Sequence, residues 1–142
     1  MMRSKMNQEQ LIKQLSDSDP AVRWDACGLL HDNGDEGAVS FLVERLQRDP
    51  DPQVRGTAAY ALGGIGSPAA IPALIETMDS DHAVDQLGHS PSSCAATALD
   101  EILGTNETRI RISNSLRTLS AAAPDLEKLK REAWAYYQNW KR

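Results

Sequence analysis

The residues that could perform chemistry gather around residues 81–89. Two histidines, His82 and His89, flank Asp85, and Asp81 lies close by in the sequence. Two imidazoles and a carboxylate could hold zinc with one coordination position left open to water. However, this spacing matches no established ligand pattern, and loops rich in Asp, His, Gly and Ser are common because such residues favour turns. We therefore expect a turn in this segment and no metal site.

The same segment offers some elements of nucleophilic catalysis. His89 is followed closely by hydroxyl and thiol side chains, namely Ser90, Ser92, Ser93 and Cys94. A catalytic nucleophile needs a base beside it and a third group that orients the base. Ser90 precedes Pro91, and a serine before a proline is typical of a helix N-cap followed by the first helical residue. We expect Ser90 to cap a helix and the chain to have no catalytic residue.

Two further features have structural explanations. The glycine-rich residues 62–66 end a predicted helix, whereas a phosphate-binding loop leads from a strand into a helix. Cys27 and Cys94 lie within predicted helices without CxxC spacing. We expect both to be small buried side chains in a reducing compartment, and we expect no cofactor.

These residues are positioned by an internal repeat. An Asp-Pro-x-Val-Arg motif at residues 19–23 recurs at residues 51–55, an offset of 32 residues. The same offset relates further pairs of like residues: Ala26 and Ala58, Leu30 and Leu62, and Gly34 and Gly66. Agreement at so many positions indicates repeated structural units.

Each unit is predicted to hold two helices joined by an Asp/Pro-rich turn, with Asp as the N-cap and Pro at the first helical position. The first helices place these apolar residues toward a core: Leu11, Ile12, Leu15, Phe41, Leu42, Val43, Leu46, Ile71, Leu74, Ile75 and Met78. The second helix of the second unit has a stripe that ends before Gly66 and consists of Val54, Ala58, Ala61, Leu62 and Ile65.

The third unit and the tail depart from the repeat. About five extra residues fall within residues 79–90, after which Ser90 and Pro91 begin the last paired helix. Residues 108–113 alternate in a way that suggests extended chain. Beyond Pro124, a final amphipathic helix is predicted from Leu126, Leu129, Ala133, Tyr137 and Trp140. We expect this helix to cap the third unit, although its Trp134, Tyr136 and Trp140 could also contact a partner.

The repeat resembles the HEAT-like repeats named after phycobilisome lyases, whose signature is Asp-Pro-x-Val-Arg followed by Ala-x-x-Ala-Leu-Gly-x-Ile-Gly. The match is closest at residues 51–66, and the resemblance covers roughly residues 8–104. It implies an all-α fold, a short right-handed α-solenoid (α–α superhelix) of about three helix pairs with a C-terminal capping helix. We predict a single domain, 1–142, with repeats at about 8–34, 35–66 and 67–104 and a cap at 105–142.

The resemblance also implies roles for particular residues. In such repeats the arginine of the motif pairs with an aspartate of a neighbouring unit, which assigns Arg23 and Arg55 to the architecture. A partly exposed pair contributes only about 0.2–1 kcal/mol, so its main effect is to fix the register between units. Deoxyhypusine hydroxylases, another HEAT-like family, bind iron through His-Glu pairs; this chain has no His-Glu dipeptide.

Charge and hydropathy narrow the classes of partner. With 15 basic and 20 acidic residues the formal charge is −5, which disfavours binding to phosphate backbones. No apolar run approaches the roughly 20 residues of a membrane span, and the first ten residues are polar. We expect a cytoplasmic protein that binds neither nucleic acid nor membrane.

A protein partner is the remaining expectation. The second helices of such units usually line the concave side, and their outward register is predicted to hold Trp24, Gly28, His31, Gly56, Tyr60, Gly63, Ser93, Thr97 and Asp100. Exposed Trp and Tyr are enriched at binding hot spots, so the candidate partner-binding residues are Trp24, His31, Tyr60 and Thr97. Alternatively, Trp24 packs against the N-terminal helix and Tyr60 only covers the groove floor.

The sequence thus predicts a non-catalytic scaffold or adaptor that binds a protein on its concave face. The alternative is an accessory or lyase-type subunit that acts on a tetrapyrrole or a protein-bound cofactor. Residues 81–89 and the C-terminal Trp/Tyr helix are further candidates for the contact surface. The sequence leaves the partner and the oligomeric state open.

Overall fold

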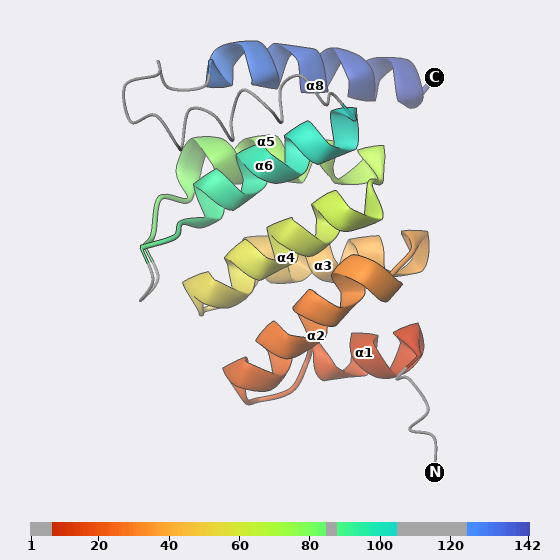
Figure 1. Ribbon diagram of the computed structural model, residues 1–142, viewed down its shortest axis with the longest axis vertical. Helices are drawn as coiled ribbons and strands as arrows, with labels where there is room; N and C mark the ends of the chain where they lie inside the picture. Colours follow the sequence, from red (N-terminus) through yellow and green to blue (C-terminus); the bar gives the residue numbers. More distant parts are fainter. Residues whose placement is uncertain (1–6, 85–87, 105–124) are drawn as a thin grey trace.

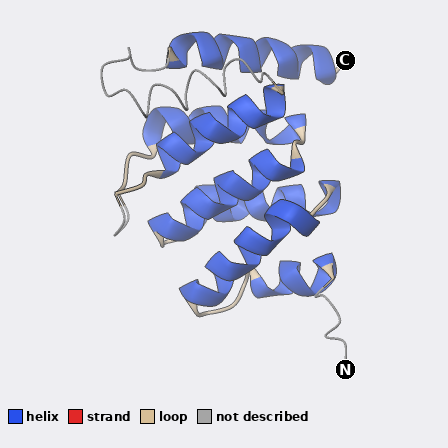
Figure 2. Ribbon diagram, in the orientation of Figure 1, coloured by secondary structure: helices blue, strands red, loops and turns tan. Residues whose placement is uncertain are grey.

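The computed structural model describes residues 7–84, 88–104 and 125–142. Within these ranges all regular structure is helical (Figure 2). The elements in chain order are α1 (Gln8–Gln14), α2 (Pro20–Asn33), α3 (Glu36–Arg48), α4 (Pro52–Ile65), the 3₁₀ helix η1 (Pro68–Ala70), α5 (Ile71–Ser80), α6 (Pro91–Leu103) and α8 (Leu126–Trp140). The extended segment predicted at residues 108–113, and most of the predicted cap before α8, lie outside the described residues.

The helices form two layers that run along the long axis of the molecule. In Figure 1, α2, α4 and α6 lie side by side in front, and α1, α3 and α5 lie behind them. Contacts join α2 to α4 and α4 to α6 within the front layer, and each front helix to the helix that precedes it in the chain. α8 covers the end of the stack beside α5 and α6. The predicted all-α, short solenoid is confirmed.

The helix boundaries follow from local capping. Asp19 and Asp51 have extended backbones, and each carboxylate accepts a hydrogen bond from the backbone N–H two residues further on, before a helix that opens with proline. Ser90 caps α6 in the same way through the N–H three residues on. Gly66 and Gly104 end α4 and α6 in the left-handed conformation, with φ of 77° and 67°. These starts and stops are where the sequence predicts them.

One continuous apolar core runs through the stack, and every α-helix within the described residues contributes to it. Its largest fully buried aliphatic side chains are Leu11, Leu15, Leu30, Leu42, Leu46, Val54, Leu62, Ile71, Leu74 and Leu99. The prediction that Phe41 is a core residue is wrong, because 46% of its surface is exposed. Leu42 and Leu46 lie one turn apart and face the core, and a residue directly before Leu42 is rotated about 100° away from that face.

α8 is attached through a short central stretch. Leu129 and Ala133 are buried and Tyr137 is half-buried, whereas Leu126 and Trp140, at the two ends of the predicted stripe, are exposed. The body of the molecule covers only the middle of the stripe. The outer surface of α8 is mixed, because exposed aromatic side chains, Trp134, Tyr136 and Trp140, lie there beside charged ones.

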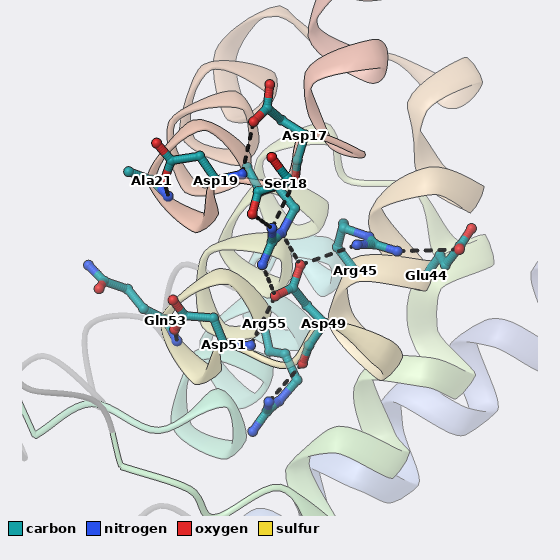
Figure 3. A network of polar contacts seen from close by, with 11 residues as sticks. Asp17, Ser18, Asp19, Ala21, Glu44, Arg45, Asp49, Asp51, Gln53 and Arg55 are labelled. Atoms are coloured by element: carbon teal, nitrogen blue, oxygen red, sulfur yellow. Dashed lines mark hydrogen bonds and ion pairs between the residues drawn. The ribbon is translucent and has the colours of Figure 1, made fainter.

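A buried ion pair joins the first helix pair to the second (Figure 3). Arg23, near the start of α2, donates from Nε and NH2 to the two carboxylate oxygens of Asp49, at 2.8 and 3.1 Å. Asp49 is the residue after α3, and it also accepts hydrogen bonds from Arg45 NH1 and from the backbone N–H of Asp51. The remaining nitrogen of Arg23, NH1, donates to the backbone carbonyls of Asp17 and Ser18. One guanidinium therefore ties together two turns that belong to successive units.

A second joint repeats this arrangement one unit later. Arg55 donates to both carboxylate oxygens of Asp81, at 2.7 and 3.2 Å, and its NH1 donates to the backbone carbonyl of Asp49. The offset of 37 residues that relates Leu62 to Leu99 places Ser92 of α6 at the position of Arg55. Its hydroxyl donates to the carbonyl of Met78 at 2.6 Å, and its backbone N–H donates to the carbonyl of Asp81 at 2.8 Å. The series of interlocked turns thus continues into α6, but without a third guanidinium.

The two ion pairs differ in burial. The side chains of Arg55 and Asp81 are 17% and 20% exposed, close to the partly exposed pair that the sequence suggests. Those of Arg23 and Asp49 are only 8% and 0% exposed. The hydrogen bonds to Asp49 raise the pKa of Arg23, so the guanidinium remains charged in the interior. A buried pair is costly to break, because loss of one partner leaves the other charged and unpaired.

We predict that Asp49→Ala lowers the free energy of unfolding by about 3–5 kcal/mol, because it strands the buried guanidinium of Arg23. Asp81→Ala should cost only about 1–2 kcal/mol, since water can solvate the more exposed Arg55. Urea unfolding followed by circular dichroism measures both losses. Equal losses in the two variants would contradict the assignment of the Arg23–Asp49 pair as the main joint.

Candidate partner-binding face

The outer surface of α2, α4 and α6 carries the predicted partner-binding residues, and we call it the B face. Trp24 of α2 and Tyr60 of α4 are 44% and 48% exposed. Thr97 of α6 is exposed, and His31 of α2 is half-buried. The three helices pack side by side in this order, so the four residues belong to one layer.

His31 and Tyr60 form a stacked pair across the α2–α4 contact. Their ring centroids are 4.0 Å apart and their planes differ by 10°. Room for this stack comes from Gly64, where a Cβ atom would lie 2.3 Å from Cδ2 of the His31 ring. His31 Nδ1 also lies 2.8 Å from a carboxylate oxygen of Asp32. The imidazole is therefore held on two sides, and it supports the Tyr60 ring.

Two hollows lie on either side of Tyr60. The larger, with a volume of about 360 Å³, lies between α2 and α4 and is lined by Trp24, Asp25, Gly28, Leu29, Thr57 and Tyr60. The smaller, with a volume of about 120 Å³, lies between α4 and α6 and is lined by Tyr60, Cys94, Thr97, Ala98 and Glu101. The tyrosine ring is thus a ridge shared by two adjacent depressions.

Part of the predicted outward register is wrong. Gly56, Gly63 and Asp100 are buried. A Cβ at Gly63 would lie 2.8 Å from Cα of Ala98, so glycine is needed here for α4 and α6 to approach each other. None of the three side-chain positions faces a partner, and the two glycines set the close spacing of α4 and α6.

The linings include residues that the sequence analysis did not single out, namely Asp25, Leu29, Thr57 and Glu101. A signal for them was present in the helical spacing. Thr57 lies three residues before Tyr60, and Glu101 lies four residues after Thr97. Each pair therefore shares one helical stripe. Leu29 was overlooked because an apolar residue in a repeat helix is expected in the core, yet it is 40% exposed.

The residues considered for metal binding and catalysis have other environments. His82 and His89 are exposed, and Asp85 lies outside the described residues. The described ranges contain no group of three or more His, Cys, Asp or Glu side chains placed to hold a metal ion. Ser90 caps α6, and its hydroxyl lies 3.1 Å from that of Ser93.

The two cysteines differ. Cys27 is fully buried in the core, where burial raises the pKa of its thiol to about 12. Cys94 is half-buried and lines the smaller hollow, so the expectation of a buried side chain holds for Cys27 and only in part for Cys94. A thiol with such a raised pKa remains protonated and unreactive near neutral pH.

Comparison with known proteins agrees with this architecture. A family model described as HEAT repeats matches residues 9–87. No curated protein matches the chain. Among solved structures, the complex of CpcE and CpcF of phycocyanin lyase from Nostoc sp. PCC7120 aligns with a TM-score of 0.59 at 22% identity, over 78% of this chain and 43% of the matched chain. The chain therefore spans less than half the length of that neighbour, and the likeness concerns the fold.

None of the helices in the described ranges combines the length and the apolar character that a bilayer crossing requires.

The burial of Cys27 gives a chemical prediction. In a Cys94→Ser variant, Cys27 should react with Ellman's reagent at pH 8 at least about 100-fold more slowly in the folded protein than in guanidinium chloride, because only the unfolded chain forms the thiolate readily. The pKa of Cys27 is higher in the folded protein than in the unfolded chain. As the pH rises above about 9, Cys27 therefore ionises in the unfolded chain, and the free energy of unfolding falls. This fall in the free energy of unfolding at high pH should be missing in a variant that also carries Cys27→Ala. Fast labelling of the folded protein would contradict the buried placement.

Proposed function

Because the chain belongs to the HEAT repeat family, we propose that it is a non-catalytic scaffold or adaptor that binds a protein segment on the B face. The observation that carries this proposal is the pair of half-exposed aromatic rings, Trp24 and Tyr60, beside two hollows. Aromatic side chains with adjacent pockets are typical of the centres of protein interfaces.

Rigidity of the B face supports the proposal. Tyr60 is held by the stack with His31, and α4 and α6 are in close contact at Gly63 and Ala98. The helices are further fixed relative to one another by the Arg23–Asp49 and Arg55–Asp81 joints. A preformed surface binds with little loss of conformational entropy, which favours affinity.

The structural neighbour is itself one complex of two different proteins, CpcE and CpcF, which supports a protein as the partner. Ser90 caps a helix and Cys27 is buried with a raised pKa, and both placements fit a binding module. In this proposal the module acts in the cytoplasm, as the sequence suggests.

The B face can be tested by affinity capture from the native cytoplasm, with the captured proteins identified and then purified. Trp24→Ala together with Tyr60→Ala should weaken binding of the identified partner at least about tenfold, since hot-spot aromatics contribute about 1–2 kcal/mol or more each. Trp134→Ala on α8 is the matched control, because it removes an exposed aromatic ring from a different surface.

A second variant blocks the larger hollow without removing a contact. Gly28 lies in the middle of α2, and a Cβ there would have no atom within 4 Å. Gly28→Gln should therefore fill the hollow while stabilising the helix by about 0.5–1 kcal/mol. Loss of partner binding with retained or raised thermal stability supports the proposal. A partner that binds all these variants equally well would place the interface elsewhere.

A second candidate function has one observation in its favour. The fold neighbour is a phycocyanin lyase, so an accessory role on a tetrapyrrole or a protein-bound cofactor is the alternative. The larger hollow, about 360 Å³, is at the small end of the range of about 300–1,000 Å³ for ligand pockets.

The alternative predicts that a bilin added to the purified protein changes its visible absorption, and that Gly28→Gln removes the change. An unaltered bilin spectrum at millimolar protein would exclude this role for the B face. The spectrum of bilin with serum albumin is a control for non-specific adsorption.

A further inference from the structure

The exposed charges of the B face have one sign. Within α2, α4 and α6, all of whose residues are described, the two arginines are both occupied in the Arg–Asp joints. No lysine occurs in these helices. The acidic residues that remain at the surface are Asp25, Asp32 and Glu101, the last of them half-exposed. A partner is thus met by carboxylates, while the arginines of these helices are engaged in the joints.

Each hollow combines one carboxylate with an aromatic ring. Asp25 lies in the larger hollow with the ring of Trp24, since one face of Tyr60 is stacked on His31, and Glu101 lies in the smaller hollow with Tyr60. The other lining residues are small, apolar or hydroxylated. A carboxylate beside an aromatic face is a combination that binds guanidinium or ammonium groups, through an ion pair and a cation–π contact together.

We propose that the B face binds an extended protein segment that presents two basic side chains, one to each hollow. This inference rests on the proposed function and names the chemistry of its partner. The hollows lie in successive grooves, between α2 and α4 and between α4 and α6, so they are offset by about one interhelical distance of 8–10 Å. In a polyproline II segment, residues i and i+3 point to the same side and are about 9 Å apart. The partner segment therefore carries Arg or Lys at positions i and i+3.

The probe is a fluorescein-labelled eleven-residue peptide of alanine and proline with arginines at i and i+3, and binding is followed by fluorescence anisotropy. We expect binding that weakens with added salt. Asp25→Asn and Glu101→Gln should each raise the dissociation constant about two- to fivefold, and together about tenfold. The matched control is Glu76→Gln, which makes the same charge change at an exposed residue of α5, in the other helix layer.

Several outcomes would overturn the inference. Equal affinity for a peptide with both arginines replaced by glutamine would show that charge has no role in binding. If Glu76→Gln weakened binding as much as Asp25→Asn or Glu101→Gln, the attraction would come only from the net charge of −5. A dimer in sedimentation runs of the chain alone, dissociated by Asp25→Asn plus Glu101→Gln, would make the occupant a second copy. If the basic peptide does not bind while the captured partner still requires Trp24 and Tyr60, this inference fails and the proposed function stands.

Discussion

The guanidinium–carboxylate joint between successive helix pairs is the interaction on which the rest of the structure depends. In a solenoid each unit touches only its neighbours, so the geometry of any surface that spans several units is set by the contacts between them. Arg23 and Arg55 each bind a carboxylate of the following unit and a backbone carbonyl of a turn at the end of a preceding helix. An apolar interface alone would tolerate sliding of one helix pair over the next. The directional hydrogen bonds of the joints select one register, and the B face is built on that register.

Small residues in α4 also fix the positions of the helices and of the rings on the B face. At Gly63 the α4 backbone comes so close to Ala98 of α6 that a single methyl group would clash. At Gly64 the missing side chain gives the His31 ring its place against Tyr60. The glycines of α4 thus have two uses, one toward the neighbouring helix and one toward the surface. Both lower the intrinsic helix propensity of α4, a cost that the packing around it offsets.

Local features could be predicted from the sequence, and features that depend on helix crossings could not. The cap at Ser90 needs only its own segment, so its position followed from residue order. Phe41 was misplaced because three consecutive apolar residues do not say which of them face the core. The pairing of Arg23 with an aspartate of the next unit was foreseen by resemblance, but the burial of Asp49 depends on how α2 packs against the turn between α3 and α4. The stack of His31 on Tyr60 joins residues far apart in the chain and required the α2–α4 contact to be known.

Because Ser92 stands where a third arginine would, the joints between helix pairs differ in strength along the chain. Toward the N-terminus the helix pairs are joined by bidentate ion pairs, whereas Ser92 of α6 forms two neutral hydrogen bonds to Met78 and Asp81, and α8 contacts the stack through a narrow apolar strip and the exposed Lys130–Asp79 pair. Under tension or mild denaturant, such an array is expected to fray from its C-terminal end first and to keep the α2–α4 region folded longest. Amide protons of α8 would then exchange with solvent well before those beneath Trp24 and Tyr60.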